Sequence, residues 1–243
     1  MSLNSNETGP RVVFFGKRGG VKNGENPSAE TIPNPEAERF GIKWISQADY
    51  LKDQARQRGL IEKNGYLVDP VTRKVDRGQV CEEALLGRYR VGRNEKIPVP
   101  INKDTRTYAK ARNFIIDFVK DHQPMESAKK EENISGQLES IIRSRLTDER
   151  LSFSAVNFYT AVGSPLDYQY GVDGWVEIID LDGKKEIITF DLKTGSHANP
   201  DIQADILLRL DLKEDGFTPK QTIMELFKFT DEVTRIYQER INF

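Results

Sequence analysis

The stretch "GVDGWVEIIDLDGKKEIITFDLKTG", residues 171–195, predicts a β-hairpin. Both halves are rich in β-branched and aromatic residues, which favour strands, and the Asp182-Gly183 dipeptide between them is a preferred hairpin turn. Yet the same halves contain Asp173, Asp191 and Lys193 at positions where a half-buried sheet favours apolar residues. Packing alone does not account for these three side chains.

The alternation of side chains along a strand indicates where the three charged groups lie. Asp191 and Lys193 are two residues apart, so they point to the same face of their strand. A turn at 182–183 pairs residues whose numbers sum to about 365, which sets Asp173 opposite about position 192. The pairing therefore predicts that the carboxylate of Asp173 lies within reach of Asp191 and Lys193.

Two carboxylates in such proximity repel each other and need a compensating cation. A hard divalent ion such as Mg²⁺ takes oxygen ligands, and it can activate water and polarise a phosphoryl oxygen. The ammonium of Lys193 can orient that water or neutralise the charge that develops in the transition state. The pattern therefore indicates phosphodiester hydrolysis. The alternative is a solvent-facing hairpin in which Asp191 and Lys193 form a surface ion pair of little energetic consequence.

The segments "YGVDGWVEI" and "ITFDLKTG" resemble the PD-(D/E)XK nuclease superfamily, and most closely its RecB-like and phage exonuclease branch. The resemblance covers residues from about 130 to 210. Asp173 matches the first acidic residue, and Asp191-Leu192-Lys193 matches the acidic-X-Lys triplet. The sequence differs from the family pattern in having Val172 before the first acidic residue, Asp rather than Glu in the triplet, and Leu207 where a tyrosine is usual.

The resemblance implies a set of site residues and a cofactor. It implies that Asp173, Asp191, Lys193 and Gln203 are catalytic, with Gln203 on a helix after the triplet. It also implies that Mg²⁺ or Mn²⁺ is bound by Asp173, Asp191 and a carboxylate from the preceding helix. Glu139 is the candidate for that third carboxylate, and Glu131 and Glu132 are its substitutes.

The fold class that we expect is α/β, with a mixed central β-sheet flanked by helices in a restriction-endonuclease-like core. Residues 1–100 are predicted to form an accessory region that contacts nucleic acid, and residues 101–243 are predicted to form the nuclease core. Hydrophobic periodicity and capping signals predict the remaining elements. The predicted helices are 46–58, 106–122, about 126–146, the start of 199–210, and a C-terminal helix from Pro219 with a second one from Thr230; the predicted strands are 12–15, a hairpin over 64–78 turned at Asp69-Pro70, 153–163, and the end of 199–210.

Composition narrows the classes of protein. The chain is 37% hydrophobic and 30% charged, which is typical of soluble globular proteins. It has no apolar run that could span a membrane, and the single cysteine, Cys81, excludes an internal disulfide framework and fits a reducing compartment. We therefore expect a cytoplasmic protein without a membrane partner.

Charge is unevenly distributed along the chain. The net charge of −2 argues against a basic protein that wraps nucleic acid, but residues 1–100 carry a net +4 and residues 101–243 a net −6. Basic residues surround Tyr89 in the first part and form either a DNA-facing patch or an ordinary charged surface. They are Arg73, Lys74, Arg77, Arg88, Arg90, Arg93 and Lys96.

Together these observations predict a metal-dependent nuclease that hydrolyses phosphodiester bonds, with DNA favoured over RNA as the substrate. The alternative is a catalytically silent module with the nuclease fold that binds DNA or a protein partner. A phage, bacterial defence or toxin context and a homodimer are both left open.

Overall fold

The computed structural model describes residues 39–75, 77–101, 105–123, 134–193, 203–210, 212–213, 216–217 and 219–242. All of them lie in one compact unit, Pro33–Phe243. Across these ranges the chain forms six helices and ten strands, so the protein belongs to the α/β class that the sequence predicts. The predicted strand at 12–15 lies outside the described residues.

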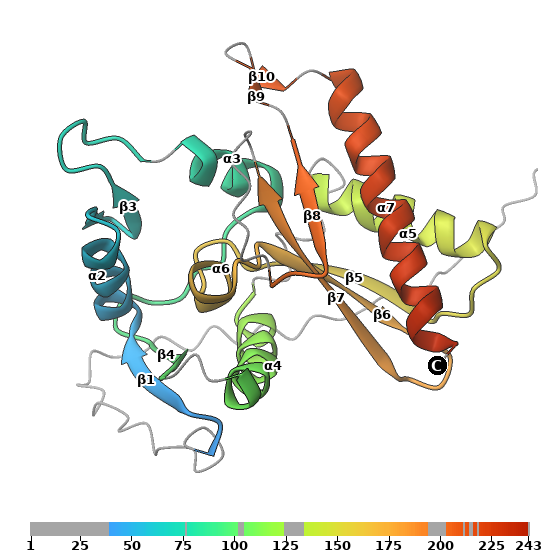
Figure 1. Cartoon of the computed structure of the whole chain (residues 1–243), viewed down its shortest axis with the longest axis horizontal. Helices are drawn as coiled ribbons and strands as arrows, with labels where there is room; N and C mark the ends of the chain where they lie inside the picture. Colours follow the sequence, from blue (N-terminus) through green and yellow to red (C-terminus); the bar gives the residue numbers. More distant parts are fainter. Residues whose placement is uncertain are drawn as a thin grey trace, which may run out of the picture. The chain divides into compact units, whose positions relative to one another are not determined.

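A four-stranded mixed sheet is the centre of this unit (Figure 1). Its strands are β5 (Ala155–Thr160), β6 (Gly174–Ile179), β7 (Lys185–Lys193) and β8 (Ile206–Arg209), in that spatial order. β6 runs antiparallel to both of its neighbours, β5 and β7, and β8 runs parallel to β7. The mixed sheet flanked by helices that the sequence predicts is therefore present.

Apolar side chains of these strands cover both faces of the sheet. One face packs against α5 (Ile134–Asp148) and α7 (Pro219–Ile241). The other face, around Trp175, packs against α4 (Thr105–Asp121) and α6 (Pro165–Tyr170). Because both faces are covered, a charged side chain on either face is withdrawn from water unless it lies near a strand end.

The remaining elements precede the central sheet or follow it. β1 (Ile42–Ser46) pairs antiparallel with β4 (Lys96–Pro100), and β2 (Ile61–Lys63) pairs antiparallel with β3 (Tyr66–Val68). The other elements are α2 (Gln47–Gln57), α3 (Arg77–Leu86), β9 (Leu212–Lys213) and β10 (Gly216–Phe217).

Most of the predicted elements are present in the described residues. Ser46 caps α2 by accepting a hydrogen bond from the backbone N–H of Asp49 at 3.1 Å, as the capping signal predicts. Helix α4 matches the predicted helix at 106–122 and β5 the strand at 153–163. Helix α5 begins at Ile134, and residues 126–133 lie outside the described part.

The turn predicted for the first hairpin is wrong. The hairpin predicted at Asp69-Pro70 turns instead at Asn64-Gly65, where both residues have positive φ, of 54° and 87°. This geometry belongs to a two-residue hairpin turn, and Asn-Gly is its preferred sequence. The Asp69-Pro70 turn is followed only by a single bridge between Val68 and Val75.

Helix α7 and the segment 199–210 also differ from the prediction. Helix α7 is one continuous helix, so no second helix begins at Thr230. Thr230 donates its hydroxyl to the carbonyl of Phe227 within the helix rather than capping a new one. In the segment 199–210 the described residues before β8, including Gln203, are not helical, and the strand prediction for its end is confirmed.

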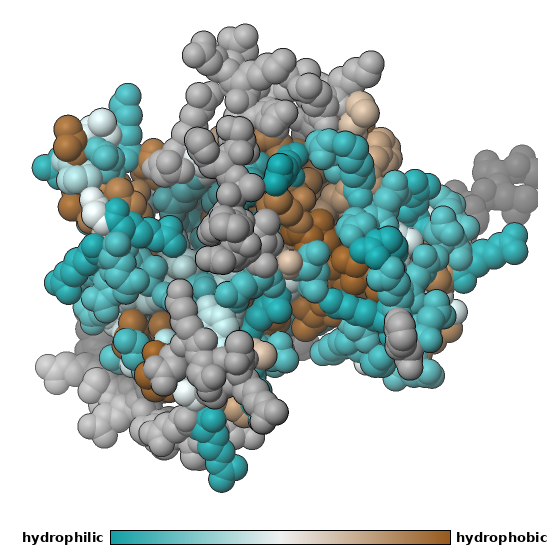
Figure 2. Space-filling view, viewed as in Figure 1, coloured by the Kyte–Doolittle hydropathy of each residue, from teal (hydrophilic) through white to brown (hydrophobic). Residues whose placement is uncertain are grey.

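No helix in the described ranges combines the length and apolar character that a membrane span requires. Figure 2 shows hydrophobic residues at the surface beside α7. Three of the exposed ones belong to the first half of that helix, Ile223, Met224 and Phe227.

Candidate active site

Asp173 lies immediately before β6, where strands β6 and β7 separate. Its backbone N–H donates to the carbonyl of Phe190 at 2.9 Å, and the backbone N–H of Leu192 donates to its Oδ2 at 2.7 Å. The paired residues of these strands sum to 364 rather than the predicted 365, because the loop from Asp180 to Lys184 is longer than a two-residue turn. The carboxylate of Asp173 therefore lies between the positions of Asp191 and Lys193.

Gly174 allows the strands β5, β6 and β7 to pack closely beside Asp173. A Cβ added at this residue would lie 2.6 Å from the backbone carbonyl oxygen of Tyr159 on the neighbouring strand β5. Only a residue without a side chain fits between the two backbones. The glycine thus lets β5, β6 and β7 remain closely packed where Asp173 begins the strand.

Asp191 and Lys193 complete the cluster, on the same face of β7. The Nζ of Lys193 lies 2.7 Å from Oδ1 of Asp191. The side chain of Asp191 is only 3% exposed, whereas that of Lys193 is 30% exposed. This is a partly buried ion pair whose cation extends toward solvent, and not the surface pair of the alternative interpretation.

Further carboxylates act on this cluster from two other elements. Asp167 lies in the first turn of α6, and its Oδ2 accepts a hydrogen bond from the backbone N–H of Gly163 at 2.8 Å. Glu82 lies on α3. The charges of both groups act on Asp173, and that of Glu82 also acts on Lys193. Negative charge is therefore concentrated around Asp173.

Burial and the nearby negative charges determine the pKa values of the two aspartates, Asp173 and Asp167. Burial, together with the charges of Asp167, Glu82 and Asp191, raises the pKa of Asp173 well above its ordinary value, although the N–H of Leu192 opposes the rise. Burial also raises the pKa of Asp167 to about 6, against the opposing effect of the N–H of Gly163. Both carboxyl groups would ionise more readily if a cation lay nearby.

Lys193 remains an ammonium ion in this environment. Burial alone would lower its pKa, but the hydrogen bond to Asp191 and the charges of Asp191, Asp173 and Glu82 outweigh it, and the pKa of Lys193 is raised. At neutral pH its side chain therefore acts as a cation and a hydrogen-bond donor rather than as a base.

The residues present fit a hard divalent cation such as Mg²⁺. Mg²⁺ binds proteins through one or two carboxylates and keeps several of its waters. Asp191 on β7 and Asp173, immediately before β6, supply two carboxylates, and burial together with the neighbouring negative charges raises the pKa of Asp173, which a nearby cation would lower. Among the described residues no group of three or more His, Cys, Asp and Glu side chains is arranged to hold a metal ion, so any ion here would depend on water for its remaining ligands.

Glu139 and Gln203 make other contacts. Oε1 of Glu139 lies 3.0 Å from Nη2 of Arg143, one turn further along α5, and the same guanidinium donates to the carbonyl of Val156. Gln203 is exposed, and its side chain lies near enough to Tyr108 on α4 to oppose the rise that burial causes in the pKa of that tyrosine. The structure thus brings together Asp173, Asp191 and Lys193, but it pairs Glu139 and Gln203 with residues outside this cluster. Glu131, Glu132 and His197 lie outside the described residues.

The contacts of Glu139 lead to a prediction about its role. Replacing Glu139 by glutamine keeps the helix and removes only the charge that pairs with Arg143, so we expect the cleavage rate to stay within about threefold of the unchanged protein. Asp191→Asn, measured in parallel in a metal-dependent cleavage assay, is expected to lose activity. An equal loss of cleavage activity in both variants would indicate that Glu139 acts with Asp191 in the site.

Sequence reasoning missed Asp167 and Glu82. For Asp167 the signal was present, because Ser164-Pro165 followed by an acidic residue three positions after the serine is the start of a capped helix. The side chain of Ser164 accepts from the N–H of Leu166, as such a cap should. Glu82 had no comparable signal, since the proximity of α3 to the hairpin is a matter of tertiary packing.

The comparisons with known proteins give the chain no relatives. No family model matches it, and neither a curated protein nor a solved structure does. The site must therefore be interpreted from its own residues and their geometry.

Proposed function

We propose that the protein is a metal-dependent nuclease that hydrolyses phosphodiester bonds of nucleic acid, with DNA as the favoured substrate. One observation carries the proposal. Asp173, immediately before β6, and Asp191 on β7 are near enough for their charges to interact, and the ammonium of Lys193 lies 2.7 Å from Asp191. Two carboxylates and a cationic donor at one point are the groups that this chemistry needs.

Each residue of the cluster has a distinct role in this proposal. Asp173 and Asp191 would hold Mg²⁺ or Mn²⁺, which supplies an activated water and polarises the phosphoryl oxygen when bound. The hydrogen bond from the N–H of Leu192 fixes one oxygen of Asp173. Lys193 would donate to the phosphoryl oxygens as their negative charge increases, because it is already an ammonium ion.

The resemblance to the PD-(D/E)XK superfamily supports the same proposal. Asp191 and Lys193 lie on β7 and Asp173 immediately precedes its partner strand β6 within a mixed sheet, which resembles the hairpin of that family. The preference for DNA follows from the resemblance.

A cleavage assay tests the proposal. The full chain is incubated with linear duplex DNA, circular single-stranded DNA, circular duplex DNA and RNA, each with Mg²⁺, with Mn²⁺ and with EDTA. We expect cleavage of DNA with either metal and none with EDTA, and the circular substrates separate endonuclease from exonuclease action. Asp191→Asn, purified identically, controls for contaminating nucleases. If none of the substrates is cleaved with either metal, the proposal is overturned.

A further inference from the structure

Arg209, the last residue of β8, lies beside the candidate active site. β8 pairs parallel with β7, and in this register Asp191 is opposite Leu207 and Lys193 is opposite Arg209. The pairing continues past the strand, because the backbone N–H of Leu210 donates to the carbonyl of Lys193 at 2.9 Å. Neighbouring strands are about 4.8 Å apart. The register therefore places a second basic residue one strand away from Lys193.

The side chain of Arg209 lies on the face of the sheet that carries the cluster. Its neighbours Leu208 and Leu210 are buried in the core on the side of α5 and α7. Because side chains alternate along a strand, Arg209 points to the opposite face, which is the face of Asp191 and Lys193. Arg209 is exposed and the side chain of Lys193 is 30% exposed. Both basic groups are thus accessible at the ends of their strands.

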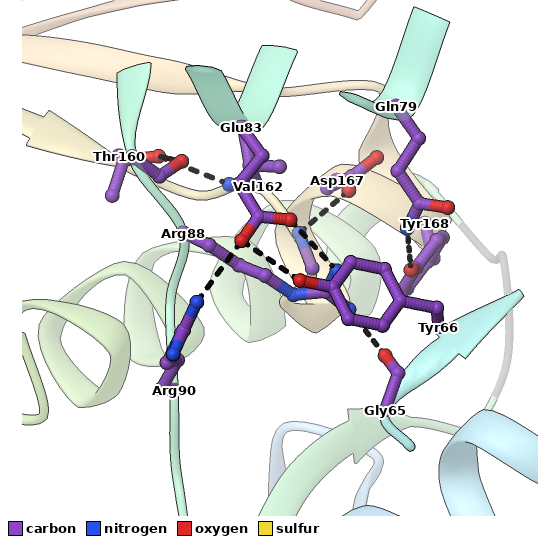
Figure 3. Close-up of polar contacts among 12 residues, drawn as sticks. Gly65, Tyr66, Gln79, Glu83, Arg88, Arg90, Thr160, Val162, Asp167 and Tyr168 are labelled. Carbon is purple, nitrogen blue, oxygen red and sulfur yellow. Dashed lines mark hydrogen bonds and ion pairs between the residues drawn. The ribbon is translucent and has the colours of Figure 1, made fainter. Parts of the chain in front are cut away.

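The guanidinium of Arg209 is not held by any other group in the described part of the chain. It takes part in no hydrogen bond, ion pair or ring contact with the residues described. Arg88 and Arg90 differ from it, since both lie against Glu83, and Arg88 also donates to the carbonyl of Gly65 (Figure 3). With respect to the described residues, the N–H donors of Arg209 are therefore open to a ligand.

The charge of the site makes such a free cation necessary for binding a nucleic-acid strand. Four carboxylates concentrate negative charge there, and the ammonium of Lys193 is already paired with Asp191. A phosphodiester strand carries one negative charge per phosphate, and these carboxylates repel it. A guanidinium that no carboxylate neutralises offsets this repulsion, and its planar N–H donors match the oxygens of a phosphate.

We propose that Arg209 binds the phosphate next to the scissile one, so that the substrate backbone crosses from β7 to β8. This inference rests on the proposed nuclease function, and it adds a residue that recognises the substrate without taking part in bond cleavage. Contacts to phosphates carry no information about base sequence, so Arg209 contributes affinity and not sequence preference. The ligand that it recognises is a phosphodiester strand.

Binding is measured from the fluorescence anisotropy of a short labelled DNA strand and of its duplex, over a range of salt concentrations in EDTA. R209Q is expected to weaken binding about fivefold or more at ~0.1 M salt. We also expect the slope of log affinity against log salt to become shallower by about 0.7 for the single strand and about 0.9 for the duplex, the values for one lost phosphate contact. R209K retains the charge and is expected to retain the slope.

R150Q is the matched control. Arg150 is exposed, and its side chain, like that of Arg209, has no partner among the described residues. It lies before the start of β5, whereas the site lies at the end of this strand, where Thr160 pairs with Gly174. The strand is six residues long. That corresponds to about 20 Å, which exceeds the screening length of about 10 Å at 0.1 M salt. R150Q is therefore expected to change binding less than twofold.

Cleavage kinetics separate this inference from the proposed function. R209Q is expected to raise KM for DNA about fivefold or more and to keep kcat within about threefold, because the phosphate on Arg209 is not the one cleaved. Circular dichroism verifies that the variants are folded. If R209Q matches the unchanged protein in KM and salt slope, or if R150Q weakens binding equally, the inference is overturned even though DNA is cleaved.

The remaining outcomes are also decisive. A shallower salt slope in R209Q, without cleavage of any substrate by the unchanged protein, upholds Arg209 as a phosphate contact and overturns the nuclease function alone. Absence of DNA binding by the unchanged protein overturns the inference about Arg209.

Discussion

Replacing Lys193 by alanine is expected to reduce the rate of DNA cleavage by about a hundredfold to a thousandfold, with little change in the fold. The loss follows from removing a donor whose charge acts directly where negative charge develops, an effect that commonly reaches about 10²–10³ in rate. Removal of the ammonium also leaves Asp191 and Asp173 facing each other without their nearest cation. Single-turnover cleavage at saturating Mg²⁺ measures the chemical step.

Two comparisons separate this effect from a general change in charge. Lys185→Ala removes an exposed lysine from the start of the same strand and is expected to retain full activity. Lys193→Arg retains the positive charge and is expected to keep more activity than Lys193→Ala. Circular dichroism and thermal unfolding verify that each variant is folded. Full activity in Lys193→Ala would remove this residue from the mechanism.

The local signals in the sequence predicted the hairpin that carries the candidate site. Alternation fixed which side chains of β7 share a face, and this depends only on strand geometry. The register was wrong by one residue, because the loop after Asp180 is held by a hydrogen bond from its N–H to the carbonyl of Lys184 that the dipeptide Asp182-Gly183 does not reveal. Asp173 nevertheless lies near the triplet as predicted, because its carboxylate accepts a hydrogen bond from the backbone N–H of Leu192.

Contacts between elements distant in the chain could not be predicted in the same way. Glu139 lies at the flank of the apolar stripe of α5, as its spacing predicts, but spacing does not reveal that Arg143 occupies the next turn as its partner. Likewise α3 and α6 contribute Glu82 and Asp167 to the surroundings of Asp173 through packing of helices against the sheet. A single sequence contains no measure of which helix ends meet which strand ends.

The basic residues around Tyr89 illustrate the same limit. Their sequence pattern was equally consistent with a DNA-facing patch and an ordinary surface. The structure separates them, since Arg88 is buried on Glu83 while Arg90 and Arg93 are exposed beside a cavity.

Replacing Asp173 by asparagine is expected to abolish cleavage and at the same time to stabilise the metal-free protein above neutral pH. Asparagine has nearly the same shape and can still accept the hydrogen bond from Leu192, but it places no negative charge in this buried position. The asparagine variant also loses one of the two carboxylates proposed to hold the metal. Loss of activity with a gain of stability distinguishes a strained functional site from a structural residue.

The pH dependence of stability gives the sharper measurement. The pKa of Asp173 is raised in the folded protein and that of Asp167 is about 6, so between about pH 4 and those values the folded state binds more protons than the unfolded state. Stability of the metal-free protein therefore falls as the pH rises from 5 to 8, and the part due to Asp167 over this range amounts to about 1–1.5 kcal/mol. Mg²⁺ or Mn²⁺ is expected to restore stability at pH 8 in the unchanged protein.

Urea unfolding in EDTA at pH 5 and pH 8, repeated with metal, compares the unchanged protein with Asp173→Asn. The variant is expected to lose less stability between the two pH values and to gain little from metal, because the group that titrates and would bind the ion is gone. Asp182→Asn, an exposed aspartate in the loop between the same two strands, is expected to behave like the unchanged protein. Equal pH dependence in the unchanged protein and in Asp173→Asn would mean that Asp173 is ionised at neutral pH without a cation, and the case for a metal at this pair would lose its electrostatic support.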